Sequence, residues 1–431
     1  AGARSDHRRQ GIYLTMKVLL IGSGGREHAL ATGLAADKSV TELHCVPGNP
    51  GIAEIAKLHS INILDNKAIV ELAKSLAIDL VVVGPEIPLV NGVADELRAA
   101  KIAVFGPSKA AAQLEGSKHF AKGVMRDAGV PTAKSFTCEN REEIERALDE
   151  FGAPYVVKDD GLAAGKGVVV TNDREVALNH ALTCKRVVIE EYLNGPEISL
   201  FGISDGTNIL PMEPAQDFKR AHDNDEGPNT GGMGAYSPLP WAPTDIVEDT
   251  YTKVLAPMIA EMAARGTPFV GLLYAGLAVT DRGIKVIEFN ARFGDPETQV
   301  LIPRLKTPLA DLLYKAATGN LIDSVLQWRD ESAVTVVLAA NGYPGEVKTG
   351  DEISNLKPEA DVTIFHAGTK TDSQNGNLIS SGGRVLTVTG LGSDISQARD
   401  KAYRTISQID LSGSFYRRDI ALNASVAEKG N

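Results

Sequence analysis

Short apolar runs alternate with helical repeats over the first quarter of the chain and predict a parallel α/β unit. Residues 17–21 form a β-rich run, residues 22–25 a glycine-rich turn, and residues 26–36 carry apolar residues at helical spacing. The same alternation predicts further strands and helices at residues 43–46, 68–76, 79–84, 92–100 and 102–106. Because strands that alternate with helices usually pair in parallel, we expect a sheet covered on both faces and ending near residue 116.

The periodicity changes after this sheet. Residues 117–128 predict one helix, with Ser117 as its N-cap and Gly129 just past its end. Residues 131–206 predict a compact run of strands with one helix near residues 174–182. The remaining predicted elements are a helix at 245–265, a hairpin of residues 272–280 and 284–290, and strands at 334–339, 362–365 and 384–388.

These changes predict a multidomain α/β and α+β protein. The expected parts are an N-terminal α/β domain at 16–117, a central domain at 118–130 and 207–332, an inserted unit at 131–206, and a strand-rich C-terminal domain at 333–431. Residues 1–15 are polar and basic and lack the apolar core of a secretory signal, so we interpret them as an upstream extension or an expression remnant.

Composition narrows the class of protein. Hydrophobic residues make up 43% and charged residues 23% of the 431 residues, as in soluble globular proteins. The formal charge of −11 argues against nucleic-acid binding, and no apolar run approaches the roughly 18 residues of a membrane span. Cys45, Cys138 and Cys184 are far apart and lack metal-site spacing, so we expect no disulfide framework and a cytoplasmic location.

A glycine-punctuated loop at residues 158–167 is the first candidate for chemistry. It lies between two β-runs and carries Lys158 and Lys166 at its ends. Backbone N–H groups freed by glycine form anion-binding concavities, and two ammonium groups suit a polyphosphate. A strand rather than a helix follows, so this is not a P-loop; the alternative is a flexible hairpin with solvated lysines.

An acidic segment follows about twenty residues later, where the strand at 187–190 leads into Glu191 and Glu197. Such a segment suits an adenine hinge, with backbone groups on the base and a carboxylate on the ribose hydroxyls. The alternative interpretation is a solvated strand end.

Residues 286–297 hold the third candidate. Glu288 and Asn290 point to the same face of a strand, and a carboxylate beside an amide oxygen suits Mg²⁺ that keeps waters and binds substrate phosphates. Arg292 follows and is suited to a phosphoryl or carboxylate oxygen. An exposed edge strand is the alternative, but it leaves Arg292, Asp295 and Glu297 unexplained.

Two glycine-rich segments complete the set. Residues 216–234 are long, polar and rich in glycine, which favours a shaped backbone around a small ligand. Residues 22–25 precede a helix, but Glu27 stands where a dinucleotide fingerprint needs its third glycine. A single phosphate is therefore the better candidate for that turn, and the alternative is a tight turn that packs helix on strand.

Together these segments resemble the ATP-grasp superfamily. The motifs at 22–29, 84–86, 161–167, 227–236 and 292–299 are together similar to the glycinamide ribonucleotide synthetase family, over residues 16–419. The resemblance implies a Rossmann-like N-terminal domain, an ATP-grasp core with a mobile lid at 131–206, and a small C-terminal domain. It also implies ligation of glycine to 5-phosphoribosylamine through a glycyl phosphate, giving glycinamide ribonucleotide, ADP and phosphate in purine biosynthesis.

The resemblance further implies roles for individual residues. ATP-binding residues carried over are Lys118, Lys158, Gly165, Lys166, Gly167, Glu190, Glu191, Leu193 and Glu197, with Lys158, Lys166 and Arg292 in catalysis. Glu288 and Asn290 would bind Mg²⁺ or Mn²⁺. Substrate-binding residues carried over are Gly24, Gly25, Arg26, Asn49, Gly51 and Glu86 for phosphoribosylamine, and Asp217, Asn229, Thr230, Gly231, Gly232, Asp295, Pro296 and Glu297 for glycine.

Two positions depart from the family pattern. Asp159 stands where the family usually has alanine, and Phe218 replaces a common histidine. A carboxylate beside Lys158 would weaken ATP binding unless it turns outward or meets the metal. Other ATP-grasp ligases or carboxylases, a nicotinamide-dependent dehydrogenase and an idle nucleotide-binding subunit remain the alternative functions. We expect a monomer with at most transient contacts to neighbouring pathway enzymes.

Overall fold

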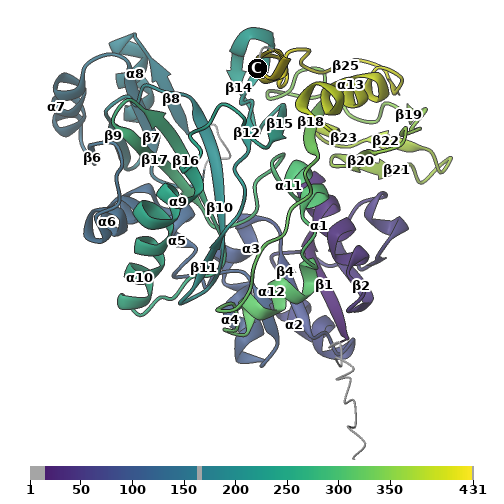
Figure 1. Cartoon of the computed structure of the whole chain (residues 1–431). Helices are drawn as coiled ribbons and strands as arrows, with labels where there is room; N and C mark the ends of the chain where they lie inside the picture. The colour runs from purple at the N-terminus through teal and green to yellow at the C-terminus, as the bar shows by residue number, and fades with distance from the viewer. Residues whose placement is uncertain (1–14, 163–166, 430–431) are drawn as a thin grey trace, which may run out of the picture.

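The computed structural model describes residues 15–162 and 167–429, and its N-terminal part is the predicted parallel sheet (Figure 1). The strand order is β3-β2-β1-β4-β5. The elements of this part are β1 Met16–Gly22, α1 Gly25–Ala36, β2 Val40–Pro47, η1 Ile52–Glu54, β3 Lys57–Leu58, α2 Asn66–Ser75, β4 Leu80–Val83, α3 Glu86–Asn91, α4 Val93–Ala99 and β5 Ala103–Phe105. Residues 18–21 of β1 are fully buried, because helices cover both faces of a parallel sheet.

The inserted unit is a separate four-stranded antiparallel sheet of order β6-β9-β7-β8. Its elements are β6 Ser135–Cys138, α7 Arg141–Phe151, β7 Tyr155–Asp159, β8 Val168–Thr171, α8 Arg174–Thr183 and β9 Val187–Glu190. The expectation of one helix was wrong, because α7 accompanies α8 on this sheet. Asn140 caps α7 by accepting from the Glu143 N–H, and Ile144 and Leu148 are buried one turn apart.

The central sheet has the order β11-β10-β16-β17. Its strands are β10 Glu197–Asp205, β11 Ile209–Pro211, β16 Val270–Thr280 and β17 Gly283–Asn290, and the predicted hairpin is the β16–β17 pair. Strand β10 therefore pairs outside the inserted unit in which we had placed it. Helices that accompany this region are α5 Gln113–Gly116, α6 Lys118–Ala128, α9 Ile246–Thr250, the π-helix η3 Tyr251–Leu255, α10 Ala256–Ala264, α11 Thr298–Arg304 and α12 Leu309–Ala317.

The C-terminal sheet draws strands from both sides of the expected boundary near residue 332. Its order is β12-β15-β18-β23-β20, with β25 also paired to β18. Its strands are β12 Gln216–Asp217, β15 Gly234–Ser237, β18 Ser332–Ala340, β20 Val362–His366, β23 Arg384–Gly392 and β25 Ser414–Phe415. The other elements are β13 Arg220–His222, η2 Asp223–Asp225, β14 Glu226–Asn229, β19 Ile353–Ser354, β21 Thr369–Thr371, β22 Leu378–Ser380, α13 Ile395–Ile406, β24 Asp410–Leu411 and α14 Leu422–Lys429.

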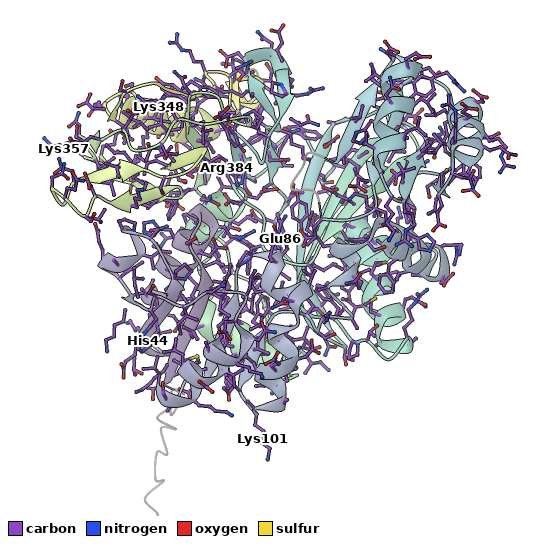
Figure 2. All side chains as sticks on the ribbon, turned by 180° about the vertical axis from the view of Figure 1, so that it is seen from behind. His44, Glu86, Lys101, Lys348, Lys357 and Arg384 are labelled. Atoms are coloured by element: carbon purple, nitrogen blue, oxygen red, sulfur yellow. The ribbon has the colours of Figure 1, made fainter. Side chains whose placement is uncertain are left out.

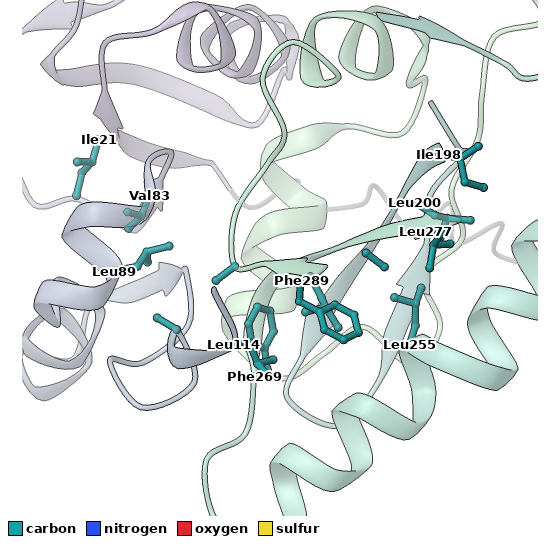
Figure 3. Close-up of a cluster of buried hydrophobic side chains, with 14 of the residues drawn as sticks. Ile21, Val83, Leu89, Leu114, Ile198, Leu200, Leu255, Phe269, Leu277 and Phe289 are labelled. Atoms are coloured by element: carbon teal, nitrogen blue, oxygen red, sulfur yellow. The ribbon is translucent and has the colours of Figure 1, made fainter. Parts of the chain in front are cut away.

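One hydrophobic core runs from the N-terminal sheet into the central sheet (Figure 3). Ile21 and Leu89 from the first part, Leu114 from α5, and Phe289 from β17 belong to the same buried cluster. Burial of this continuous apolar surface favours a defined relation between the two sheets. Within residues 15–162 and 167–429, no helix is long and apolar enough to cross a membrane.

Candidate active site

A cavity of about 2130 Å³ lies where the four parts meet. Figure 2 shows Glu86 of the N-terminal part and Arg384 of the C-terminal part near the middle of the molecule, and both line this cavity. The predicted site residues that line it are Arg26, Glu86, Lys118, Lys158, Gly167, Glu190, Glu191, Leu193, Glu197, Asp217, Asn229, Thr230, Gly231, Glu288, Asn290, Arg292, Asp295 and Glu297. Gly165 and Lys166 lie outside the described residues. The fold thus gathers most of the candidates around one space.

A buried charge cluster forms one wall. The Lys158 ammonium at the end of β7 donates to the Ile287 carbonyl oxygen at 2.9 Å and pairs with Glu190 Oε2 at 2.9 Å. Lys122 of α6 pairs with the other oxygen of Glu190 at 3.0 Å. Burial alone would raise the pKa of Glu190, but Lys158 and Lys122 outweigh it and hold the pKa below its usual value. Glu190 is therefore an ionised anchor for two lysines.

The start of the glycine loop is tied to α6. The Asp160 carboxylate accepts from the Ser117 hydroxyl at 3.0 Å and the His119 N–H at 2.9 Å, and it pairs with Arg186. Lys118 donates to the Gly161 carbonyl oxygen at 3.0 Å. Charge-assisted bonds of this kind restrict a loop strongly, so this end of the loop has a defined position.

Asp159 faces away from the cavity. Successive residues of a strand alternate between faces, and Lys158 lines the cavity whereas Asp159 does not. Asp159 instead lies near Cys184, and burial together with Asp159 raises the pKa of that thiol. The departure from the family pattern therefore places no carboxylate at the cavity wall beside Lys158.

We expect Asp159→Ala to change the ATP KM by less than about twofold, because a charge on the opposite face of β7 is screened from the cavity. Steady-state phosphate release with varied ATP measures this, with Lys158→Ala as the positive control. A large rise in the ATP KM of Asp159→Ala would contradict the outward orientation.

Glu288 and Asn290 lie side by side on β17 and both line the cavity. Within the described residues, the Glu288 carboxylate makes no hydrogen bond or ion pair, and Asn290 Oδ1 accepts only a long bond from Arg292 at 3.4 Å. No group of three or more His, Cys, Asp or Glu in residues 15–162 and 167–429 could hold a metal ion. Two oxygen donors at an open cavity fit a hard cation that completes its shell with water and phosphate.

Arg292 is oriented by two carboxylates. Its Nε lies 3.3 Å from Glu86 Oε2 and its Nη2 lies 3.1 Å from Glu115 Oε1, while Glu115 also accepts from the Ala291 N–H at 2.8 Å. A planar guanidinium held on two edges presents a defined fork, which suits a phosphoryl or carboxylate oxygen.

An acidic cluster lines the same cavity as Glu288 and Asn290. Lys219 pairs with Glu197 at 3.0 Å and with Asp217 at 3.5 Å. Glu297 accepts from the Ser199 and Tyr274 hydroxyls at 3.0 and 2.8 Å. Burial raises the pKa of Asp217 to about 6, with Glu297 and Glu197 adding to the rise and Lys219 opposing it. The cluster carries more negative than positive charge, so it suits a cationic ligand group.

The N-terminal turn is occupied by a side chain of the protein itself. Glu27 accepts from the Gly24 N–H at 2.6 Å and from Arg26 Nε at 2.6 Å. A Cβ on Gly22 or Gly84 would lie 2.4 and 2.2 Å from atoms of Glu27. These contacts account for Gly22, Gly24 and Gly84 and favour the tight-turn interpretation for that part of the motif. Of this turn and the start of the helix after it, Arg26 lines the cavity.

Several expected substrate residues lie outside the cavity. Asn49 donates to the Ser23 and His366 carbonyl oxygens at 2.8 and 2.9 Å, and it is 5% exposed. Gly51 packs against the His28 ring and Gly232 against Pro296. The candidates that the structure does not bring to the cavity wall are Gly24, Gly25, Asn49, Gly51, Gly232 and Pro296.

Other cavity residues were not predicted. They include Glu115, Lys122, Lys219, Tyr274, Tyr343 and Arg384, whose side chains make polar contacts with predicted site residues. Lys122 follows Lys118 by one helical turn, which is a signal that sequence spacing offers. Lys219 lay within a segment already singled out, whereas Arg384 had no local signal.

The fold is that of ATP-grasp enzymes. The biotin carboxylase domain of Hydrogenobacter thermophilus 2-oxoglutarate carboxylase, solved with MgADP, superposes with a TM-score of 0.71 at 17% identity over 93% of this chain and 92% of that chain. The model of the phosphoribosylglycinamide synthetase ATP-grasp domain matches residues 116–298. The class of protein is therefore an ATP-grasp carbon–nitrogen ligase.

The family follows from full-length relatives. The phosphoribosylglycinamide synthetase N and C domain models match residues 16–115 and 333–423. The phosphoribosylamine–glycine ligase of Streptomyces coelicolor is 60% identical, over 96% of this chain and 100% of its own length. The ligase of the same name from Mycobacterium tuberculosis is 52% identical, over 95% of this chain and 99% of its own length. The Thermotoga maritima ligase structure has a TM-score of 0.81 at 33% identity, over 94% of this chain and 100% of that chain. The chain belongs to the phosphoribosylamine–glycine ligase family.

Proposed function

We propose that this chain joins glycine to 5-phosphoribosylamine with ATP, through a glycyl phosphate, and releases glycinamide ribonucleotide, ADP and phosphate. One cavity that combines buried lysines, an oxygen-donor pair and an acidic cluster carries this proposal, together with the full-length family relationship. The alternative function is that of another ATP-grasp ligase or carboxylase. It has weaker support, because the biotin carboxylase domain that shares this fold is only 17% identical to this chain.

In the first proposed step, a glycine carboxylate oxygen attacks the γ-phosphorus of ATP, and the bond to the β-phosphate oxygen breaks. Lys118, Lys158, Lys166 and the backbone at Gly165 and Gly167 bind the phosphates, while Arg292 steadies the transferred group. Glu191 and Leu193 would bind the adenine and Glu197 the ribose, and Glu190 acts by holding Lys158 and Lys122. Glu288 and Asn290 would hold Mg²⁺ or Mn²⁺, which neutralises phosphate charge.

In the second step, the amine nitrogen of phosphoribosylamine attacks the acyl carbon, phosphate leaves, and the nitrogen loses a proton. Arg26 and Glu86 at the cavity wall would orient this substrate, and Gly24 and Gly25 remain predictions beside them. Closure of the lid over the cavity would keep water from the glycyl phosphate. We infer that the enzyme acts as a monomer in the cytoplasm. The described cysteines are all free thiols, which agrees with a reducing compartment.

Asp217 and Glu297 would receive the glycine ammonium, and the Asn229–Gly232 backbone would close around the rest. Glycine offers no side chain, so its charged ends are the main features that a site can recognise. Asp217 and Glu297 line the cavity within one acidic cluster, which supports this assignment.

We expect glycine binding to weaken as the pH falls through about 6, because the raised pKa of Asp217 means that its carboxylate becomes protonated there. The loss is about tenfold at one pH unit below that pKa. Calorimetric titration of glycine into enzyme with Mg·ADP, between pH 7 and 5, measures it. Asp217→Asn should bind weakly at every pH; equal affinity of the unmodified chain at both ends of the range would contradict the assignment.

Phosphate release from Mg·ATP, with carboxylates and amines added in turn, tests the function. Release that requires both glycine and freshly made phosphoribosylamine supports the proposal, and transfer of ¹⁸O from glycine to phosphate supports the glycyl phosphate. Release with a different pair would overturn the substrate assignment and leave the ATP-grasp class intact.

A further inference from the structure

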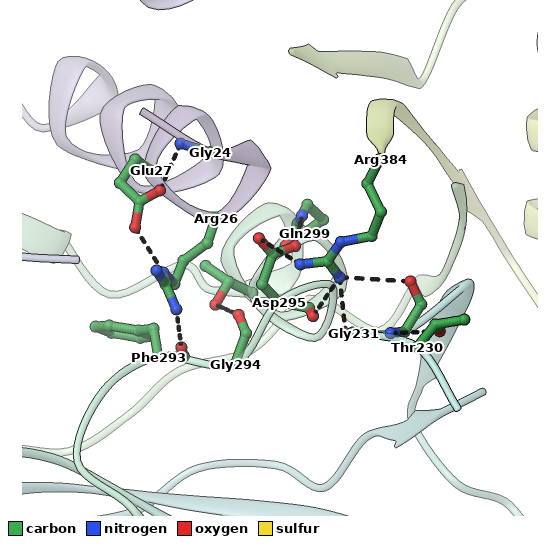
Figure 4. Close-up of polar contacts among 12 residues, drawn as sticks. Gly24, Arg26, Glu27, Thr230, Gly231, Phe293, Gly294, Asp295, Gln299 and Arg384 are labelled. Carbon is green, nitrogen blue, oxygen red and sulfur yellow. Dashed lines mark hydrogen bonds and ion pairs between the residues drawn. The ribbon is translucent and has the colours of Figure 1, made fainter. Parts of the chain in front are cut away.

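Arg384 reaches the cavity from the first residue of β23, in the C-terminal sheet (Figure 4). Its Nη1 donates to the carbonyl oxygens of Asp295 at 2.7 Å, Gly231 at 2.8 Å and Gly232 at 3.4 Å. Its Nη2 lies 3.2 Å from Asp295 Oδ2. One guanidinium therefore joins two segments that are distant in sequence and that both belong to the proposed glycine site.

The surroundings are shaped around this guanidinium. The Gly231 N–H donates to the Tyr343 hydroxyl at 2.9 Å, and a Cβ on Gly231 would lie 3.1 Å from Arg384 Cζ. Gln299 Nε2 donates to the other oxygen of Asp295 at 2.7 Å. A planar fork with several fixed donors can hold three carbonyls and a carboxylate at once, which a lysine ammonium cannot reproduce.

These contacts bear on the role of Asp295, which the family resemblance assigns to the glycine site. Burial alone would raise its pKa, but Arg384 and Arg26 outweigh burial and hold the pKa below its usual value. The carboxylate is thus ionised but already paired on both oxygens. Asp217 and Glu297 share the single ammonium of Lys219 with Glu197, so the excess negative charge of the cavity lies in that cluster. Asp295 therefore shapes the pocket rather than receiving the ammonium.

We propose that Arg384 is a positioning residue for the amino-acid substrate, which fixes Asp295 and the Gly231–Gly232 backbone from the C-terminal sheet. The inference rests on the proposed function, because that function makes these two segments the glycine pocket. Through Arg384, the C-terminal part of the fold contributes to the glycine site, although Arg384 itself does not contact the reacting atoms.

The test compares Arg384→Lys and Arg384→Ala with Arg399→Ala. Arg399 lies on α13 in the same part of the fold, donates to the Ile420 and Arg418 carbonyl oxygens, and does not line the cavity. Phosphate release is measured with glycine varied at saturating ATP and phosphoribosylamine, and then with ATP varied. Activity of the unmodified chain in this assay tests the proposed function. The KM of each variant relative to that of the unmodified chain tests the role of Arg384.

We expect both Arg384 variants to raise the glycine KM about tenfold or more while the ATP KM stays within about twofold, because charge-assisted bonds to the glycine segments alone are lost. Added guanidinium ion should bring the glycine KM of Arg384→Ala part of the way back to that of the unmodified chain. Gly231→Ala, made alone, should raise the glycine KM because its new Cβ displaces the Arg384 side chain. Arg399→Ala should leave both constants unchanged. An unchanged glycine KM in the Arg384 variants, or parallel rises in both constants, would overturn the proposal.

Discussion

Glu288→Gln is expected to lower kcat by about 10³-fold and to shift the Mg²⁺ requirement to much higher concentration. Glu288 is the one charged member of the candidate metal pair, and a neutral amide attracts a divalent cation far less than a carboxylate does. Loss of the cation removes several kcal/mol of charge stabilisation at the transferred phosphoryl group, and about 1.4 kcal/mol corresponds to a tenfold change in rate.

The expected loss is specific to metal binding. Within the described residues, the Glu288 carboxylate makes no hydrogen bond or ion pair, so its replacement by an amide leaves no described buried partner unpaired and the fold should keep its stability. Mn²⁺ binding followed by electron paramagnetic resonance, beside phosphate release at varied Mg²⁺, measures both effects. Asp281→Asn, at the exposed tip of the same hairpin, serves as the control and should match the unmodified chain. Unaltered Mn²⁺ affinity in Glu288→Gln would remove this residue from the metal site.

Features that depend on local chain geometry could be predicted from the sequence. Glu288 and Asn290 share a face because residues two apart on a strand always do, and the structure places both at the cavity. Ser117 accepts from the Phe120 N–H at the start of α6 and Gly129 adopts a left-handed conformation at its end, as predicted. Caps are set by groups within one helical turn, so a short stretch of sequence is enough to locate them.

The missed helix α7 had similar local signals. Asn140 followed by Glu143, with Ile144 and Leu148 at helical spacing, is a helix start that sequence patterns can reveal. The strand-rich surroundings led to an all-strand expectation for residues 131–173, which was an error of interpretation rather than a limit of the sequence.

The partners of buried charges could not be predicted in the same way. Glu190 with Lys122, Arg292 with Glu115, and Asp295 with Arg384 join segments whose meeting depends on how whole sheets pack. No short-range periodicity encodes such pairs, and the burial that makes them energetically important exists only in the folded chain. The glycine turn at 22–25 shows the same limit, because Gly22 and Gly24 make room for Glu27 rather than only for a ligand.

Lys158→Met is expected to lower kcat/KM for ATP by about 10²–10³-fold. This is the typical loss when an enzyme loses one preorganised group that stabilises charge in the transition state. Burial alone would lower the pKa of Lys158, but Glu190 and Glu288 raise it above its usual value, so the ammonium remains charged at the cavity wall. Lys122→Met is the matched control, since Lys122 pairs with the same carboxylate at nearly the same distance.

Each of these variants leaves Glu190 with one remaining lysine, so damage to the charge cluster itself should lower the melting temperature of both to a similar extent. The loss in ATP turnover should be far larger for Lys158→Met, because Lys158 donates to the Ile287 carbonyl oxygen, next to Glu288, and therefore lies beside the candidate metal pair. Thermal unfolding and steady-state phosphate release with varied ATP separate the two effects. Equal kinetic losses in both variants would mean that Lys158 acts through the stability of the cluster and not through the phosphates.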